Sequence, residues 1–268
     1  MKKPLFSHSR TEHPDAANFE RHCHTQAELL FVLHGHGDFI VEGARYPLRD
    51  GSVLLTRPRE YHYVRPDADA SYERYVVNFD TDFPVDSAAG LPILSPGGDA
   101  GKGVWSDSGQ VIPHLRHAFA FLDTVAGRSE PDSDLFLTAL RTVISQALLL
   151  LFLQGPDGQS ATEDETVSAL IDFINRHLTE ELSLDRLSQA MFVSKYHLCR
   201  RFREYTGMPI LTYINTKRMA LAAQLLEAGM PAEEVAVQVG FKDYSAFWRR
   251  FVRILGKSPA ALRGGKSR

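Results

Sequence analysis

The sequence contains Leu198-Cys199-Arg200-Arg201-Phe202-Arg203-Glu204-Tyr205-Thr206-Gly207 and repeats it, in altered form, as Phe247-Trp248-Arg249-Arg250-Phe251-Val252-Arg253-Ile254-Leu255-Gly256. Each copy has two apolar residues four positions apart, two arginines directly before the second of them, and a glycine five positions after it. Residues four apart share one helix face, so each copy predicts a helix with an apolar inner face and a positive outer face. The glycines predict that both helices end in a left-handed cap.

A short amphipathic helix and a turn are predicted before each copy. Before the first copy, Ser183 and Ser194 are suited to cap the helix over 184–191 and the basic helix after it. Before the second, Pro231 is predicted at the first position of a helix that extends to Val239. Short helix, turn and longer basic helix is the order of the helix-turn-helix, whose second helix enters the major groove of DNA. A solvated Arg-rich surface is the alternative for one copy alone, and the presence of two copies disfavours it.

The region from 166 to 263 resembles the AraC/XylS family of bacterial transcription regulators. The matching residues are Leu187, Ser194, Leu198, Arg200, Phe202, Gly207, Arg218, Ala222, Leu225, Ala236, Gly240, Phe241, Phe247, Arg249, Phe251, Gly256, Pro259 and Arg263. The resemblance implies two helix-turn-helix motifs joined by a long helix, binding to double-stranded promoter DNA, contact with RNA polymerase and a homodimer. It also implies a bacterial, cytoplasmic, nucleoid-associated protein.

The outward stripe of each basic helix predicts the contacts with DNA. On the first helix the resemblance places base contacts at Tyr196, Cys199 and Arg200. For Trp248 on the second helix, packing against the central helix is the alternative to contact with a thymine methyl group. The predicted DNA-binding residues are Lys195, Tyr196, Cys199, Arg200, Arg203, Tyr244, Ser245, Trp248 and Arg249. One chain is therefore expected to span two successive major grooves, about 34 Å apart.

Charge is distributed unevenly along the 268 residues. Residues 1–155 carry 14 Lys and Arg against 20 Asp and Glu, a balance of −6, whereas residues 183–268 carry 15 against 6, a balance of +9. This asymmetry is typical of a nucleic-acid-binding module joined to an acidic domain. Two cysteines give no disulfide framework, which fits a reducing cytoplasm. No signal peptide is recognised after Met1, and the apolar run Ala147–Leu153 is too short to span a bilayer, so no membrane association is expected.

The N-terminal half predicts a β domain. Short β-prone runs at Glu28–Val32, Gly37–Glu42, Gly51–Thr56 and Tyr72–Phe79 are separated by Gly, Pro and Asp turns. The spacing His22-x-His24, three residues, Glu28, six residues, Gly35 resembles the first motif of cupins, which binds a divalent metal in cupin enzymes. The second half of the cupin pattern is altered around Glu60 and Pro66. The resemblance therefore implies a small β-barrel more firmly than it implies a metal.

Three interpretations of this polar group remain open at this point. Alternate residues on a strand share a face, so His22 and His24 point together and a later strand can bring Glu28 and His62 alongside, with Tyr61 nearby. The group is then a divalent-metal site made of His22, His24, Glu28 and His62, a polar pocket for a small-molecule effector such as a carbohydrate, or a set of structural hydrogen bonds. Cys23 is expected to face away from the two histidines.

The predicted fold is α+β, with four segments. These are a cupin-like effector-binding barrel over 1–110, helices over 111–154 that serve dimerisation, a linker over 155–164, and an all-α double helix-turn-helix domain over 165–268. Within the helical segment we expect helices at Val111–Asp123 and Leu135–Gln154, the second apolar on almost all sides. The predicted function is an effector-responsive transcription regulator, an activator rather than an enzyme. The alternative is a cupin-type metalloenzyme or metal sensor fused to a DNA-binding module.

Overall fold

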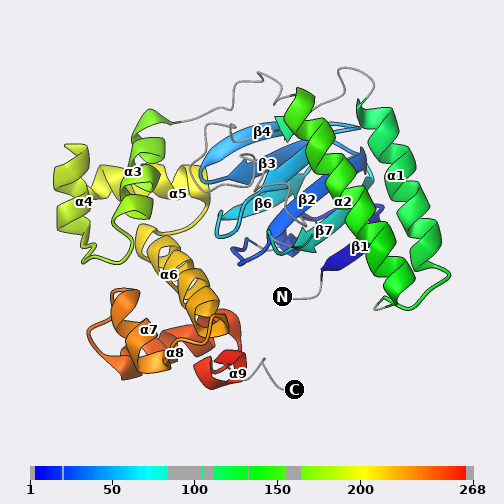
Figure 1. The fold of residues 1–268 in the computed structure, drawn as a ribbon. Helices are drawn as coiled ribbons and strands as arrows, with labels where there is room; N and C mark the ends of the chain where they lie inside the picture. The colour runs from blue at the N-terminus through cyan, green and yellow to red at the C-terminus, as the bar shows by residue number, and fades with distance from the viewer. Residues whose placement is uncertain are drawn as a thin grey trace.

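The computed structural model describes residues 4–19, 21–81, 83, 104–105, 111–131, 133–154 and 164–263. The fold is α+β, as predicted: two antiparallel sheets are followed by helices (Figure 1). The strands are β1 (Leu5–Thr11), β2 (Ala27–His34), β3 (Gly37–Val41), β4 (Ala44–Leu48), β5 (Val53–Thr56), β6 (His62–Pro66), β7 (Tyr72–Phe79) and β8 (Val104–Trp105), with a 3-10 turn η1 (Ala16–Asn18). The helices are α1 (Val111–Ala126), α2 (Asp134–Gln154), α3 (Glu165–Arg176), α4 (Leu184–Met191), α5 (Lys195–Thr206), α6 (Ile210–Glu227), α7 (Ala232–Gln238), α8 (Tyr244–Leu255) and α9 (Pro259–Arg263).

The two sheets have the strand orders β1-β7-β2-β5-β8 and β4-β3-β6. They pack on each other through a shared apolar cluster, and together they are called the barrel below. Two of the predicted strands are shorter than expected. β3 ends at Val41 because Glu42, with φ 48°, and Gly43, with φ 77°, form the turn into β4. β5 begins at Val53 because Gly51, with φ 83°, belongs to the preceding turn.

Strand β2 is apolar along most of its length because both of its faces are covered. Leu30 and Val32 pack between the two sheets, whereas Leu29 and Phe31 pack in the cluster that includes α1 and α2. Alternate strand residues point to opposite faces, so a strand that is covered on both sides reads as a continuous apolar run. The larger sheet is therefore the middle layer on this side of the molecule.

Helix α2 matches the predicted helix Leu135–Gln154, begins one residue earlier, and contains the apolar run Ala147–Leu153 near its end. Its segment Asp134–Leu153 is long and apolar enough to cross a membrane by length and composition. However, Leu140, Ile144 and Leu148 are fully buried in the cluster that α2 shares with the larger sheet. These contacts make α2 a core helix of this domain.

The smaller sheet is covered on its outer face by the helices that follow residue 164. Ile40 and Tyr63 lie in one cluster with Leu170, Ile174 and Phe202, which come from α3 and α5. The strands thus lie between α1 and α2 on one side and α3 to α5 on the other, and α6 leads away to α7, α8 and α9 (Figure 1). The predicted linker over 155–164 falls outside the described residues except for Asp164, which caps α3.

Short helix, turn and longer helix occur twice, as α4–α5 and as α7–α8. The predicted caps at Ser183 and Ser194 are confirmed, and Gly207 and Gly256 adopt left-handed φ angles of 72° and 66°. Pro231 is not the first helical residue of α7. With ψ 140° its backbone is extended, so it is the N-cap instead.

Candidate effector site and nucleic-acid interface

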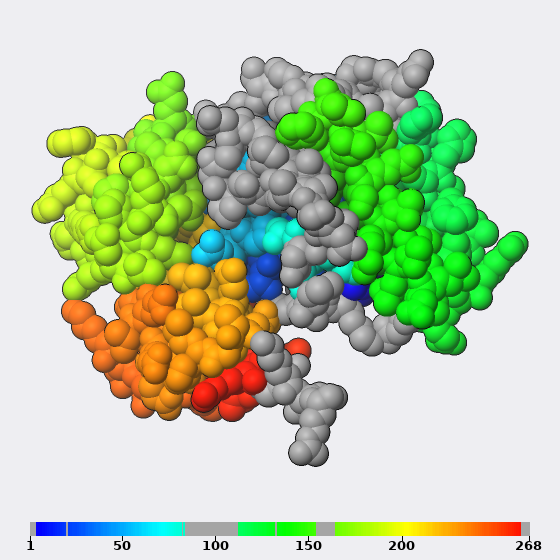
Figure 2. Space-filling view, in the orientation of Figure 1, coloured from blue at the N-terminus to red at the C-terminus, as the bar shows by residue number. Residues whose placement is uncertain are grey.

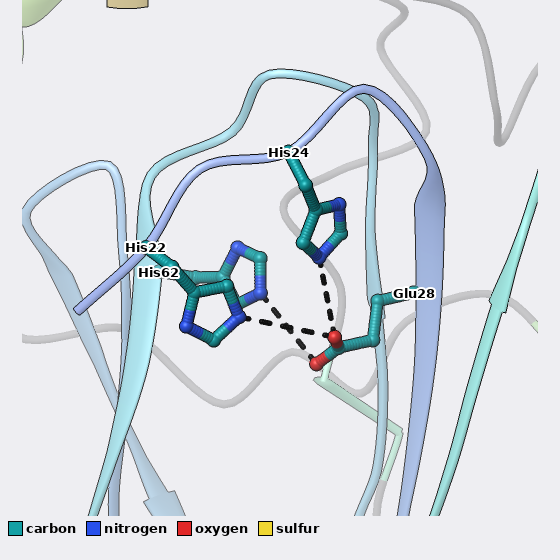
Figure 3. A group of neighbouring side chains, drawn as sticks. All are labelled: His22, His24, Glu28 and His62. Atoms are coloured by element: carbon teal, nitrogen blue, oxygen red, sulfur yellow. Dashed lines mark hydrogen bonds and ion pairs between the residues drawn. The ribbon is translucent and has the colours of Figure 1, made fainter. Parts of the chain in front are cut away.

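Four polar side chains converge inside the barrel (Figure 3). One ligand atom each from His22, His24, Glu28 and His62 lies within 4.8 Å of the others. Glu28 is near the start of β2 and His62 is at the start of β6, while His22 pairs with His62 through two backbone hydrogen bonds of 3.1 and 3.0 Å. The predicted convergence of these four residues, the His/Glu cluster, is therefore present.

Two of the imidazole rings are held by backbone carbonyls behind them. Nδ1 of His24 lies 2.8 Å from the Gln26 carbonyl, and Nδ1 of His62 lies 2.9 Å from the Glu60 carbonyl. A carbonyl only accepts, so each Nδ1 is the donor, and in the neutral ring Nε2 carries the lone pair. The structure thus directs the lone-pair nitrogens of His24 and His62 toward Glu28.

The carboxylate of Glu28 is the centre of this group. Its oxygens lie 3.2 Å from Nε2 of His24, 3.5 Å from Nε2 of His62 and 3.9 Å from Nε2 of His22. Burial raises the pKa of Glu28, but its contacts with the three histidines outweigh burial and hold that pKa well below the usual range. Nε2 of His62 is buried and has no hydrogen-bond partner.

Asn78 is a member of this site that the sequence analysis missed. It lies on β7 opposite Glu28, and its Nδ2 donates to Glu28 Oε2 at 2.8 Å. The same nitrogen is 3.3 Å from Nε2 of His24. The available signal was an amide on the face of β7 that also carries Tyr72, Arg74 and Val76.

Tyr61 does not join the His/Glu cluster, contrary to its prediction as an effector-binding residue. It immediately precedes His62, and strand alternation turns its ring to the outer face, 5.7 Å from the ring of Tyr213 on α6. Cys23 also lies outside the His/Glu cluster, as expected. It packs instead against the apolar cluster between the smaller sheet and the helices that follow residue 164. Burial raises the pKa of the Cys23 thiol to about 12, so it stays protonated.

A second polar group joins the barrel to the helices. The carboxylate of Glu42, in the β3–β4 turn, accepts from Lys217 Nζ at 2.8 Å and from Asn175 Nδ2 at 3.2 Å, as well as from the Tyr213 hydroxyl. The backbone N–H of Tyr61 donates to the same carboxylate at 2.5 Å. Glu42 and Lys217 are 5% and 6% exposed, so this is a buried ion pair.

Two short chains of contacts lead from the His/Glu cluster to this ion pair. The N–H of Arg59 donates to the His24 carbonyl at 2.7 Å, and Lys217 Nζ donates to the Arg59 carbonyl at 2.5 Å. His62 is directly bonded to Tyr61, whose N–H holds Glu42. One residue, Arg59, thus lies between His24 and Lys217, and two residues, Tyr61 and Glu42, lie between His62 and Lys217.

A cavity of about 500 Å³ opens at this junction. Its lining mixes both charges and comes from the β3–β4 turn, the loop before β6, α3 with the segment after it, and α6. The lining residues are Glu42, Arg57, Pro58, Arg59, Glu60, Ile171, Asp172, Asn175, Arg176, Leu178 and Lys217.

The predicted DNA-binding residues lie at the surface of α5 and α8. The exposed ones are Lys195, Tyr196, Arg200, Arg203, Tyr244, Ser245, Trp248 and Arg249. Cys199 is only half-exposed, since it packs in part against the neighbouring apolar cluster. Trp248 is 44% exposed, which leaves its ring available to a partner rather than enclosed against α6. Phe202 and Phe251 are fully buried, as the inward assignment predicted.

Comparisons with known proteins agree with these two halves. Residues 9–143 match the AraC-like ligand binding domain, and residues 187–265 match a helix-turn-helix domain. The HTH-type transcriptional activator RhaS of Escherichia coli is 24% identical over 254 residues, which are 93% of this chain and 89% of that protein.

Two solved structures are also similar. ToxT of Vibrio cholerae with a bound unsaturated fatty acid has a TM-score of 0.44 at 15% identity, covering 99% of this chain and 97% of that one. The C-terminal domain of AraT, a response regulator from Geobacillus stearothermophilus, has a TM-score of 0.38 at 25% identity, covering 39% of this chain and 88% of that one. The match to the ligand-binding domain spans half of the chain. The chain therefore belongs to the AraC family, as a DNA-binding transcription regulator that responds to an effector.

Proposed function

We propose that the His/Glu cluster is the effector site and that it binds a divalent transition metal. The observation that supports this proposal is that Nε2 of His24 and Nε2 of His62 face the buried carboxylate of Glu28. In the neutral ring these nitrogens carry lone pairs, which repel the carboxylate unless a proton or a metal cation lies between them. Three imidazoles and one carboxylate form a donor set that suits zinc, iron, nickel or manganese.

His22, His24, Glu28 and His62 would hold the ion. A divalent cation held there would neutralise the carboxylate, and the four side chains would be restrained as its ligands. The carbonyls behind His24 and His62 orient these ligands, as outer partners of metal-binding histidines usually do. His22 and His24 have side chains that are 42% and 27% exposed, so the site also has an open side on which a small polar effector, such as a carbohydrate, can approach.

The response is proposed to travel through the buried ion pair of Glu42 and Lys217. A ligand shifts a conformational balance only by the difference in its affinity for the two states, so it must act on groups that move. His24 and His62 are linked to Lys217 through Arg59 and Tyr61. The cluster thus senses, and α6 carries the change to the DNA-binding helices.

The finer features of regulation belong to the same proposal. The DNA contacts are made by the exposed residues of α5 and α8 named above, with Arg200 reading a guanine. Leu149 and Leu153 on α2, which are 51% and 72% exposed, lie in a homodimer interface. The regulator works as an activator with RNA polymerase in the bacterial cytoplasm, in keeping with the name of the relative RhaS, and the barrel has no catalytic role.

The test uses the full-length chain after chelator treatment, together with an operator selected from random DNA. Metal binding is measured by calorimetry with Zn²⁺, Ni²⁺ and Mn²⁺, and operator affinity is measured with and without the ion. We compare wild type, His24→Ala and His34→Ala; His34 pairs with Asp50 on the barrel surface and is the control. Wild type and His34→Ala should bind one ion and change their operator affinity, and His24→Ala should do neither.

Other results would point elsewhere. If His24→Ala binds metal and responds like wild type, the cluster is structural and the effector site lies elsewhere. A second arm titrates sugars against the metal-free protein. A sugar response that disappears in His24→Ala would replace the metal with a polar effector at the same residues.

A further inference from the structure

The two helix-turn-helix units have separate hydrophobic cores. Leu187, Leu198 and Phe202 belong to the cluster around α3 to α6, whereas Val235 and Phe247 belong to the cluster around α6 to α9. The space-filling view shows the two units as neighbouring lobes, yellow-green and orange to red (Figure 2). Both cores include residues of α6, and Leu221 on α6 packs against both, so the angle between the lobes depends on α6 and on the contacts across their boundary.

Arg218 on α6 lies at the boundary between these lobes. Its Nε donates to the Leu178 carbonyl at 2.8 Å and its Nη2 to the Glu180 carbonyl at 2.5 Å, both in the segment after α3. Its Nη1 donates to the carbonyl of Gly240, which follows α7, at 3.4 Å. One guanidinium therefore connects the first unit, the central helix and the second unit.

The chemistry of this contact requires arginine. The planar guanidinium offers five donors in a fixed fork, whereas a lysine ammonium is a single point charge. Backbone carbonyl oxygens carry partial negative charge and only accept hydrogen bonds, so they are suited to a cationic donor. Arg218 is 9% exposed, and burial lowers its pKa, yet an arginine stays charged in proteins.

The turn after α7 fits closely around this arginine. Gly240 has a left-handed φ of 84°, and a Cβ there would lie 2.7 Å from the Thr179 carbonyl oxygen and 3.0 Å from Nη2 of Arg218. The two backbones approach so closely that a side chain at 240 would separate them. On the surface, Lys242 and Glu181 form an exposed ion pair of 2.9 Å across the same boundary.

We propose that Arg218 is a positioning residue that fixes the distance and angle between α5 and α8, so that both fit the grooves of one operator. This rests on the proposal that both helices contact DNA. Binding by two linked units is strong only if the linkage lets both engage at once. Because Arg218 holds the second unit at a point beside the α6 axis, it restrains rotation of that unit. Binding then depends on the spacing of the two DNA boxes, which are the operator segments that α5 and α8 contact.

The experiment measures affinity of the full-length chain for an operator selected by wild type. Three further DNAs have the second box scrambled, the first box scrambled, or about five base pairs, half a helical turn, inserted between the boxes. The variants are Arg218→Met and Arg218→Lys, and the control is Lys242→Met, which removes the exposed ion pair. Thermal unfolding establishes that each protein is folded, and Arg218→Lys decides the question if Arg218→Met does not fold.

We expect wild type to gain about 100-fold or more in affinity from the second box. Arg218→Met and Arg218→Lys should lose most of this gain and tolerate the insertion better than wild type, while their affinity for single-box DNA stays within about 2-fold. Lys242→Met should behave like wild type. Equal losses on every DNA, or an unchanged spacing preference, would overturn the inference. If wild type itself binds one-box and two-box DNA equally well, the proposal that one chain contacts two successive major grooves is wrong, and the inference about Arg218 fails with it.

Discussion

The two helix-turn-helix units are alike in sequence and different in surroundings. The first unit shares its core with the barrel residues Ile40, Tyr61 and Tyr63, whereas the buried residues of the second core come from α6, from 232–239 and from α8. Both present an exposed basic helix to solvent. The comparison teaches that one helical design can be packed in two ways: the first unit also packs against the barrel, and the second packs against the end of α6.

The largest effects are expected from the paired core residues Phe202 and Phe251. Both are fully buried, so replacement with Ala should cost about 3–5 kcal/mol each. Phe202→Ala should also loosen the contact between barrel and helices, because the ring centroids of Phe202 and Tyr213 are 5.3 Å apart and Tyr213 holds Glu42. Phe251→Ala should affect only the second unit. Hydrogen exchange of the full-length chain can separate the two outcomes. A normally folded Phe251→Ala protein would show that the inward assignment of α8 is wrong.

The junction with the barrel should respond to loss of the Glu42 charge. Glu42→Gln leaves Lys217 as an unpaired buried cation, which should cost about 3 kcal/mol. Adding Lys217→Met should recover much of this loss, and urea unfolding of both single variants and the double variant completes the cycle. If the two single effects simply add, the pair has no coupling and the junction is held by apolar contacts alone.

The same pair predicts a pH dependence. Burial raises the pKa of Glu42, but the Lys217 charge and the hydrogen bonds from Lys217, Tyr213 and Tyr61 outweigh it, so the pKa is lowered. A lowered pKa contributes stability that is complete above the ordinary Glu value of about 4.3 and is lost as the pH falls through the folded value. The stability difference between wild type and Glu42→Gln should therefore stay constant from neutral pH to about pH 5 and shrink in stronger acid. A difference that grows on acidification would contradict this assignment.

A smaller effect is expected on the DNA-reading face of the first unit. Arg200→Ala should lower affinity for the selected operator by about 1–3 kcal/mol and relax preference at one base pair. Affinities for the operator and for its single-base variants give both quantities. An equal loss on every sequence would indicate that Arg200 contacts phosphate.

The smallest difference should come from the two N-caps. Ser194 accepts one long bond of 3.4 Å from the His197 N–H, whereas Asp243 accepts from Ser245 and Ala246 at 3.2 and 2.7 Å and places a negative charge at the start of α8. Asp243→Ala should therefore cost about 1 kcal/mol or more and Ser194→Ala less. Denaturant unfolding measures both, and the reverse order would show that cap geometry here does not determine stability.

Sequence reasoning located the features that depend on nearby residues. Ser183, Ser194, Gly207 and Gly256 act within one helical turn of their own position, so their roles could be predicted. The His/Glu cluster followed from strand alternation, and the same alternation, had it been applied to Tyr61, would have placed that ring outside the site.

The contacts between distant segments had no such signal. Glu42 and Lys217 are 175 residues apart, and only the folded chain brings them together. Arg218 matched a family position, but its three carbonyl partners belong to loops whose path the sequence does not specify. Asn78 reaches Glu28 because β7 pairs with β2, and that register is a tertiary property.

The central claim is that the barrel controls DNA reading through the first unit, and thermodynamic linkage tests it most directly. Metal affinity of the full-length chain is measured with and without operator DNA, and operator affinity with and without metal, in wild type and in the Glu42→Gln/Lys217→Met double variant. In wild type, metal should change operator affinity by the same factor by which operator DNA changes metal affinity, as linkage requires. The double variant should bind both ligands, but each ligand should leave the affinity for the other almost unchanged, a factor near one. A factor of one in wild type, or full coupling in the double variant, would contradict the claim.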